Sequence, residues 1–174
     1  MRTGKAERLT KETTIQATIC LDGGDVEVST GIGFFDHMLE AFAVHGGFGL
    51  KLQAVGDLYV DGHHTVEDVG IVLGQAFAKA LGDKRGITRY GQSLLPMDET
   101  LVLVACDLSG RDYLGWSVDL PAQRVGDFDT ELGKEFFLAF VRACPMSLHI
   151  RQMAGENTHH ILEAVFKGAG RALE

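Results

Sequence analysis

The sequence predicts a mixed fold of strands and helices built from two duplicated halves, residues 1–90 and 91–174, that form one compact globular unit. The first observation is a repeated cassette of two histidines and a glutamate. His63-His64-Thr65-Val66-Glu67 returns 96 positions later as His159-His160-Ile161-Leu162-Glu163. The second is that strand and helix patterns recur in the same order in both halves. The third is length, because 174 residues suit one full-sized domain or two fused half-domains.

The first half alternates strand patterns with helix patterns. Alternating apolar residues predict the first strand, and a turn rich in Asp and Gly follows it, so we expect a hairpin with the next strand. Apolar residues at helical spacing then predict two helices, each ended by glycine. The expected elements are strands at 13–21, 26–29 and 48–55, and helices at 34–44 and 63–81.

The second half repeats this order. Landmarks coincide between the halves: Glu12-Thr13 matches Glu99-Thr100 before the first strand, and Phe42 matches Phe140 in the first helix. Duplication is the economical interpretation. The expected elements are strands at 100–108, 113–119 and 146–151, and helices at 129–143 and 159–173.

Each cassette suits metal binding if it lies on a helix. The first histidine and the glutamate then share a face, whereas the two neighbouring imidazoles diverge by about 100° and face different ions. Imidazole and carboxylate together suit Mn, Fe, Co, Ni or Zn, while Ca and Mg prefer mostly oxygen. The repeat therefore predicts a dinuclear site.

Overlaying the halves adds one ligand to each cassette. His37 lies five residues before Phe42, and Glu135 lies five residues before Phe140, so the two are equivalent positions. The sequence therefore offers eight donors for two metal ions, four from each half. The first half supplies His37, His63, His64 and Glu67, and the second half supplies Glu135, His159, His160 and Glu163.

Composition excludes several classes of function. A net charge of −8 argues against a nucleic-acid surface, which needs clustered Lys and Arg. No apolar run is long enough for a membrane helix, and the N-terminus lacks the apolar core of a signal peptide, so we expect a cytoplasmic protein that binds no membrane. Three cysteines without a C-x-x-C pair indicate neither a disulfide framework nor a thiolate metal site.

Several long motifs, in order along nearly the whole chain, resemble those of the imidazoleglycerol-phosphate dehydratase family, manganese enzymes of histidine biosynthesis. They are Arg8-Leu9-Thr10-Lys11-Glu12-Thr13, Ser29-Thr30-Gly31-Ile32-Gly33-Phe34-Phe35-Asp36-His37-Met38, His45-Gly46-Gly47-Phe48, Asp61-Gly62-His63-His64-Thr65-Val66-Glu67-Asp68, Arg89-Tyr90-Gly91, Pro96-Met97-Asp98-Glu99, Ser109-Gly110-Arg111 and Asn157-Thr158-His159-His160.

The resemblance implies a duplicated α+β fold related to the second domain of ribosomal protein S5, each half a small sheet backed by two helices. It also implies a homo-oligomeric cage of 24 subunits, with active sites at subunit interfaces where cassettes from different chains meet. Family members carry either His or Glu at the position of Glu135, in agreement with the overlay.

The implied reaction is dehydration of D-erythro-imidazole glycerol phosphate to imidazole acetol phosphate by a carbon-oxygen lyase. Two Mn²⁺ ions per active site would stabilise an imidazolate while hydroxide leaves. By resemblance, Glu12 and His45 lie beside the substrate hydroxyl groups and are the candidates for proton transfer, and Glu163 is a further candidate base. The implied substrate contacts are Glu12, His37, His45, His63 and Glu67, with Arg89, Arg111 and Lys167 gripping the phosphate.

The sequence departs from the family pattern at its end. Family members continue past the position of Leu173 with a Ser-Thr-Lys segment that helps hold the phosphate, and this sequence ends at Glu174. Two other hypotheses fit clustered His and Glu: a metal-dependent hydrolase of a small phosphorylated substrate, and a non-enzymatic metal-binding cage. Arg89, Arg111 and Lys167 argue against the second, because a storage site needs no phosphate grip.

Overall fold

Four strands near the N-terminus form the first sheet. The computed structural model describes residues 1–174, and alternate residues of its strands are buried, as a half-solvated sheet requires. The strands β1 (Thr3–Leu9), β2 (Thr13–Cys20), β3 (Val26–Ser29) and β4 (Gly49–Gly56) lie in the order β1-β2-β4-β3, and the helices of this half are α1 (Gly33–His45) and α2 (His63–Leu81).

The second half builds a sheet with the same connectivity. Its strands β5 (Tyr90–Met97), β6 (Thr100–Asp107), β7 (Tyr113–Ser117) and β10 (Ser147–Ala154) lie in the order β5-β6-β10-β7, with helices α3 (Leu132–Ala143) and α4 (Thr158–Leu173) and a short ribbon of β8 (Arg124–Val125) and β9 (Phe128–Asp129). In each sheet three strands are antiparallel and the last joins in parallel. The duplicated α+β fold is confirmed, while the division at residue 90 stays a prediction.

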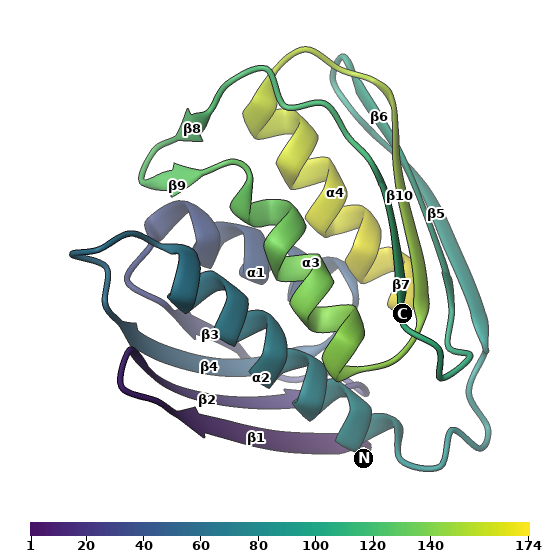
Figure 1. Cartoon of the computed structure of the whole chain (residues 1–174). Helices are drawn as coiled ribbons and strands as arrows, with labels where there is room; N and C mark the ends of the chain where they lie inside the picture. The colour runs from purple at the N-terminus through teal and green to yellow at the C-terminus, as the bar shows by residue number, and fades with distance from the viewer.

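The four helices lie between the two sheets (Figure 1). Phenylalanines from all four helices meet there. The ring of Phe140 in α3 packs against those of Phe42 in α1, at 6.1 Å between centroids, and Phe77 in α2, at 5.7 Å, and Phe136 in α3 packs against Phe166 in α4 at 5.3 Å. The buried apolar side chains form one cluster of 42 residues that spans both halves. Neither half therefore has a core of its own.

The expected hairpin between residues 13–21 and 26–29 is wrong. Strand β4 lies between β2 and β3, and β3 joins β4 in parallel. The reason is a close crossing: Gly23 and Gly24, both with positive φ, pass the start of β4 at Gly49, where a Cβ atom would meet their backbone. The chain therefore crosses the end of β4 at Gly49 and continues as β3 on the far side of that strand from β2.

Strands β1 and β5 were not expected from the sequence. The inward positions of β1 carry small residues, because Gly4 packs against the backbone of Ala76 in α2, so this strand gives no alternating apolar pattern. In β5, Gly91 packs likewise against Ala172 in α4, and the adjacent Leu94 and Leu95 put apolar residues on both faces of the strand, which hides the alternation.

The starts of the cassette helices are confirmed, and the start of one other helix is corrected. Helix α2 begins at His63 and α4 at Thr158, so both cassettes occupy an opening turn. The helix expected from residue 129 begins instead at Leu132, because residues 128–129 pair as β9.

Glycines set the spacing of the cassette helices. A Cβ atom at Gly74 of α2 would meet the carbonyl oxygen of Phe140 in α3, and one at Gly170 of α4 would meet that of Phe42 in α1. The two contacts are equivalent under the duplication. Each cassette helix therefore packs closely against a helix of the other half.

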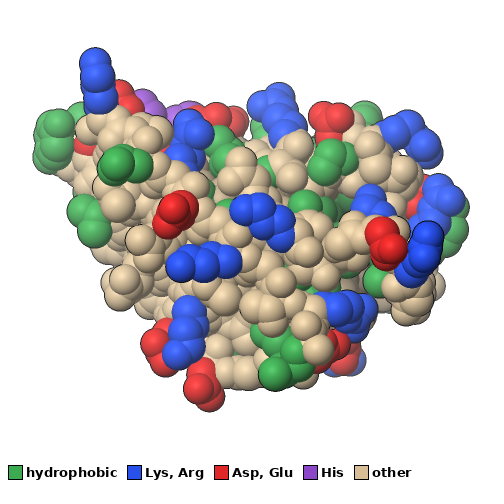
Figure 2. Space-filling model, turned by 90° about the horizontal axis from the view of Figure 1, so that it is seen from below, with side chains coloured by type: hydrophobic (Ala, Val, Ile, Leu, Met, Phe, Trp, Pro, Cys, Tyr) green, Lys and Arg blue, Asp and Glu red, His purple; other side chains and the backbone are tan.

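The outer face of the first sheet carries mixed charges (Figure 2). Lys51 pairs with Glu27 at 3.4 Å beside a shallow hollow of about 430 Å³ lined mainly by polar side chains. None of the cassette residues lines this hollow. None of the helices combines the length and apolarity that crossing a bilayer requires.

Candidate metal centre

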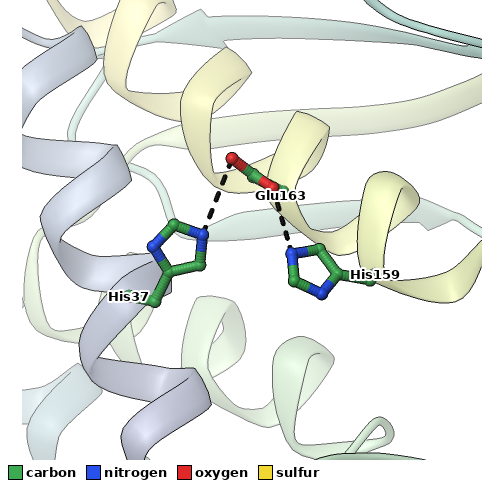
Figure 3. A group of neighbouring side chains, drawn as sticks. All are labelled: His37, His159 and Glu163. Carbon is green, nitrogen blue, oxygen red and sulfur yellow. Dashed lines mark hydrogen bonds and ion pairs between the residues drawn. The ribbon is translucent and has the colours of Figure 1, made fainter.

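Three predicted ligands converge between α1 and α4. His37 comes from α1, and His159 and Glu163 come from α4, with one donor atom of each within 4.8 Å of the others. Glu163 lies between the imidazoles: its Oε1 is 3.7 Å from Nε2 of His37, and its Oε2 is 3.1 Å from Nε2 of His159 (Figure 3). The carboxylate is buried, whereas both imidazoles are partly exposed.

Local structure places these side chains. His159 and Glu163 are four residues apart on α4, so helix geometry brings them to one face. The ring of Phe34 meets that of His159 edge to face at 5.2 Å, which restricts the imidazole from the side of α1. The close approach of the two helices at Gly170 brings His37 within reach.

Charge keeps Glu163 ionised. Burial works to raise its pKa, but the hydrogen bond from the Lys167 ammonium at 2.7 Å and the nearby imidazoles outweigh burial, so the pKa lies below its ordinary value. The donor set of two imidazole nitrogens and one ionised carboxylate fits a borderline transition metal such as Mn²⁺.

The first cassette is less assembled within one chain. His63 Nε2 lies 3.3 Å from Glu67 Oε2, and both side chains are over a third exposed. Glu135 is half-buried on α3 and makes no ion pair or hydrogen bond with either of them. The sequence groups His37 with this first cassette, because both lie in the first half of the chain. The fold instead places His37 beside the second cassette, because α1 packs against α4.

The second histidine of each cassette diverges from the first. The ring centroids of His63 and His64 are 6.2 Å apart and those of His159 and His160 are 6.3 Å apart, and in each cassette the second histidine contacts a different carboxylate from the first. His64 and His160 therefore do not join the group around Glu163.

Carboxylates that were not expected as site residues hold these second histidines. His64 Nδ1 lies 2.8 Å from Asp57, and His160 Nδ1 lies 2.8 Å from Glu99. The hydrogen bonds raise the pKa of both imidazoles, and the bond with His160 contributes most to lowering the pKa of Glu99 to about 2. A signal for Glu99 existed in the sequence, since it matches Glu12 in the overlay; Asp57 had none.

The candidate proton-transfer groups lie at two ends of the helix layer. Glu12 is exposed in the turn between β1 and β2, its carboxylate makes no hydrogen bond or ion pair, and its charge contributes to the raised pKa of His64. His45 ends α1, where burial and the charges of Lys167 and Arg171 lower its pKa. The chain alone does not bring Glu12 and His45 into contact.

The residues predicted to bind the substrate phosphate lie in two separate groups. Arg89 makes two hydrogen bonds to Asp107, at 2.7 and 3.2 Å, and this pairing, supported by the charges of Arg111 and Lys84, lowers the pKa of Asp107. Lys167 instead pairs with Glu163. No ion pair or hydrogen bond connects the two groups within the chain.

One protein family matches most of the chain. The sequence profile described as imidazoleglycerol-phosphate dehydratase matches residues 30–173. This chain belongs to the imidazoleglycerol-phosphate dehydratase family. It is 57% identical over 173 residues to the imidazoleglycerol-phosphate dehydratase of Desulforamulus reducens, covering 99% of this chain and 88% of the relative. The protein of that name from Lachnoclostridium phytofermentans is 58% identical over 174 residues, covering 99% and 89%.

Solved structures of imidazoleglycerol-phosphate dehydratases share the fold. The Staphylococcus aureus enzyme superposes with a TM-score of 0.89 at 42% identity, covering 98% of this chain and 95% of that one. The Pyrococcus furiosus enzyme gives 0.85 at 42% identity, covering 96% and 90%. Family membership makes this chain a hydro-lyase of histidine biosynthesis that acts on imidazole glycerol phosphate, and it implies a metal-dependent enzyme. It decides against the hydrolase and metal-storage hypotheses.

Proposed function

We propose that this chain dehydrates D-erythro-imidazole glycerol phosphate to imidazole acetol phosphate at a site with two Mn²⁺ ions, built by cassettes of different subunits. The observation that carries the proposal is the convergence of His37, His159 and Glu163, three of the eight predicted donors. A cytoplasmic location is part of the proposal and is supported by the biosynthetic role.

The ligand sets follow from the direction of the side chains. His37, His159 and Glu163 would hold one ion, and by the duplication Glu135, His63 and Glu67 would hold the other. His64 and His160 contact carboxylates other than those of their own cassettes, so we assign each of them to an ion held mainly by another subunit. Each site then needs two chains.

An exposed apolar loop beside the first cassette supports a contact between subunits, as the proposed homo-oligomeric cage requires. Leu58, Tyr59 and Val60 are 37%, 91% and 58% exposed, and they immediately precede the segment that carries His63. Consecutive exposed apolar residues are a typical feature of an interface. A subunit contact here would place the cassette at the boundary between chains.

In the proposed reaction, the bound metal ions would act as Lewis acids on the ring nitrogens of the substrate and favour loss of a proton from the adjacent carbon. Glu12 is the candidate to take that proton, because its carboxylate is free, and His45 is the candidate to protonate the departing hydroxyl. Glu163 is the weaker candidate base, since Lys167 and His159 already engage its two oxygens.

The phosphate end of the substrate would be held by Arg89, Arg111 and Lys167. Guanidinium groups fit phosphate oxygens through paired hydrogen bonds, and Arg89 already presents such a pair to Asp107. Because Lys167 lies apart from the two arginines in one chain, we propose that they meet across a subunit interface.

Size-exclusion chromatography and a ketone assay test this function together. Removing metal with a chelator should abolish dehydration and dissociate the cage into smaller units, and added Mn²⁺ should restore both. A chain with His159→Ala should remain small at Mn²⁺ concentrations that reassemble the wild type. A fully active enzyme after complete metal removal would contradict the proposal.

A further inference from the structure

Glu99 connects the second sheet to the start of α4. It lies in the tight turn between β5 and β6, where Met97 pairs with Thr100 and Asp98 has a positive φ of 50°. From this turn its side chain reaches the residues that open α4.

Both carboxylate oxygens of Glu99 have fixed partners. Oε1 accepts hydrogen bonds from the backbone N–H groups of Asn157, at 2.9 Å, and Glu156, at 3.3 Å. It also accepts one from Thr100 Oγ1 at 3.1 Å. Oε2 faces Nδ1 of His160 at 2.8 Å. Because backbone donors hold one oxygen, the other has little freedom to leave the imidazole.

This contact determines which nitrogen of His160 is available. An ionised carboxylate only accepts hydrogen bonds, so Nδ1 of His160 must carry a proton, and in the neutral imidazole the lone pair remains on Nε2. Carboxylates that hold a metal-binding histidine in this way fix both its tautomer and the direction of its ring.

In the first half, a different carboxylate contacts the second histidine of the cassette. Glu12 is the counterpart of Glu99 at the start of the equivalent strand, yet its carboxylate has no partner in the structure. His64 takes its hydrogen bond from the buried Asp57 instead, at 2.8 Å. The duplicated carboxylates have therefore diverged in their contacts.

We propose that Glu99 is a positioning residue that holds His160 as an Nε2 metal donor, and that Asp57 does the same for His64 and thereby leaves Glu12 free to face the substrate. This inference rests on the proposed function, in which His64 and His160 are metal ligands.

The variant Glu99→Gln tests the tautomer directly. The backbone N–H groups of Asn157 and Glu156 require an acceptor, so the amide oxygen must take the place of Oε1 and the amide NH₂ must face His160. An NH₂ group there donates to Nδ1 and forces the proton onto Nε2. Titrating the metal-free full-length chain with Mn²⁺, with free Mn²⁺ followed by electron paramagnetic resonance, should show affinity weakened about 10- to 100-fold.

Two control variants separate the positioning of His160 by Glu99 from the effect of a nearby negative charge and from a general loss of stability in α4. Glu156→Gln removes a neighbouring exposed charge whose carboxylate has no ion pair or hydrogen bond, and it should change the affinity by no more than about threefold. Asn157→Ala removes the side-chain cap of α4, and should lower the thermal midpoint by about 2–4 °C while leaving Mn²⁺ affinity intact.

The outcomes distinguish this inference from the proposed function. If the wild type binds Mn²⁺ and Glu99→Gln binds it equally well, the positioning role is wrong and the proposed function stands. A wild-type chain that binds no Mn²⁺ would overturn both.

Discussion

Gly170 of α4 lies against the carbonyl oxygen of Phe42 in α1 so closely that no side chain fits between them. The same relation holds between Gly74 of α2 and Phe140 of α3. Each contact lies along the same helix pair as a proposed ligand set. We therefore expect backbone proximity at these glycines to govern the distance between proposed ligands that belong to different halves of the sequence.

Gly170→Ala should push α1 away from α4 and move His37 from Glu163. In most exposed helix positions this change stabilises by about 1 kcal/mol, but overpacking here should destabilise by about 1–3 kcal/mol. We expect a lower thermal midpoint and weaker Mn²⁺ binding, measured by calorimetry and by metal titration.

Gly168→Ala is the matched control for Gly170→Ala. Its added methyl would meet Val104 and Ser93 of the second sheet rather than α1, so it should cost stability without weakening Mn²⁺ binding. Equal losses of metal affinity in both variants would show that the helix pair does not set the ligand distance.

Asp127→Ala should destabilise the fold by about 1 kcal/mol, because Asp127 caps α1 from the distant β8–β9 ribbon. Its carboxylate accepts hydrogen bonds from the N–H groups of Gly33, at 2.9 Å, and Phe34, at 3.3 Å, and residue 32 supplies no side-chain cap. Thermal unfolding should show a midpoint about 2–4 °C lower at neutral pH.

The contribution of Asp127 should depend on pH. Burial favours a higher pKa, but the backbone donors outweigh it and leave the pKa below the ordinary value. Because the pKa of this carboxylate is lower in the folded state than in the unfolded state, its charge stabilises the fold at pH values above the unfolded-state pKa. This stabilisation is lost as the pH falls through the folded-state pKa. The difference in thermal midpoint between the wild type and Asp127→Ala should therefore become smaller below about pH 4. Asp129→Ala, which removes a neighbouring exposed carboxylate paired with Arg124, should show little effect at either pH.

Asp57→Asn should weaken Mn²⁺ binding less than Glu99→Gln does. The second oxygen of Asp57 is buried without a hydrogen-bond partner, so an asparagine there is free to turn its carbonyl oxygen toward His64 and preserve the tautomer. Glu99→Gln lacks this freedom because backbone donors hold its oxygen. Metal titrations of both variants under one set of conditions compare them, and a larger loss in Asp57→Asn would contradict this account.

Glu12→Gln should lower kcat much more than it changes KM, because a base acts in the transition state. Arg111→Ala should raise KM first, because it removes a phosphate contact. Steady-state kinetics of the metal-loaded enzyme measure both. Arg85→Ala is the charge-matched control: Arg85 is exposed and pairs only with Asp83, so its removal should leave both constants near wild type. The reverse ranking of Glu12 and Arg111 would overturn their assigned roles.

The parts of the site that were predictable are those governed by neighbouring residues. Spacing of four residues places His159 with Glu163 wherever a helix forms, and adjacent residues such as His63 and His64 must diverge. The duplication and the opening-turn position of the cassettes followed from the same local patterns. Strand β1 was not predicted, because its inward residues, Gly4 and Ala6, are too small to form a recognisable apolar pattern.

The sequence by itself determined the place of the two His and Glu cassettes on helices and the family of the enzyme. Only the tertiary structure decided that His37 joins the cassette of the other half, that β4 separates β2 from β3, and that Asp57 and Glu99 hold the second histidines. The reason is physical: helix geometry fixes neighbours within a turn, whereas contacts between distant segments depend on how glycines and small residues let helices and strands approach.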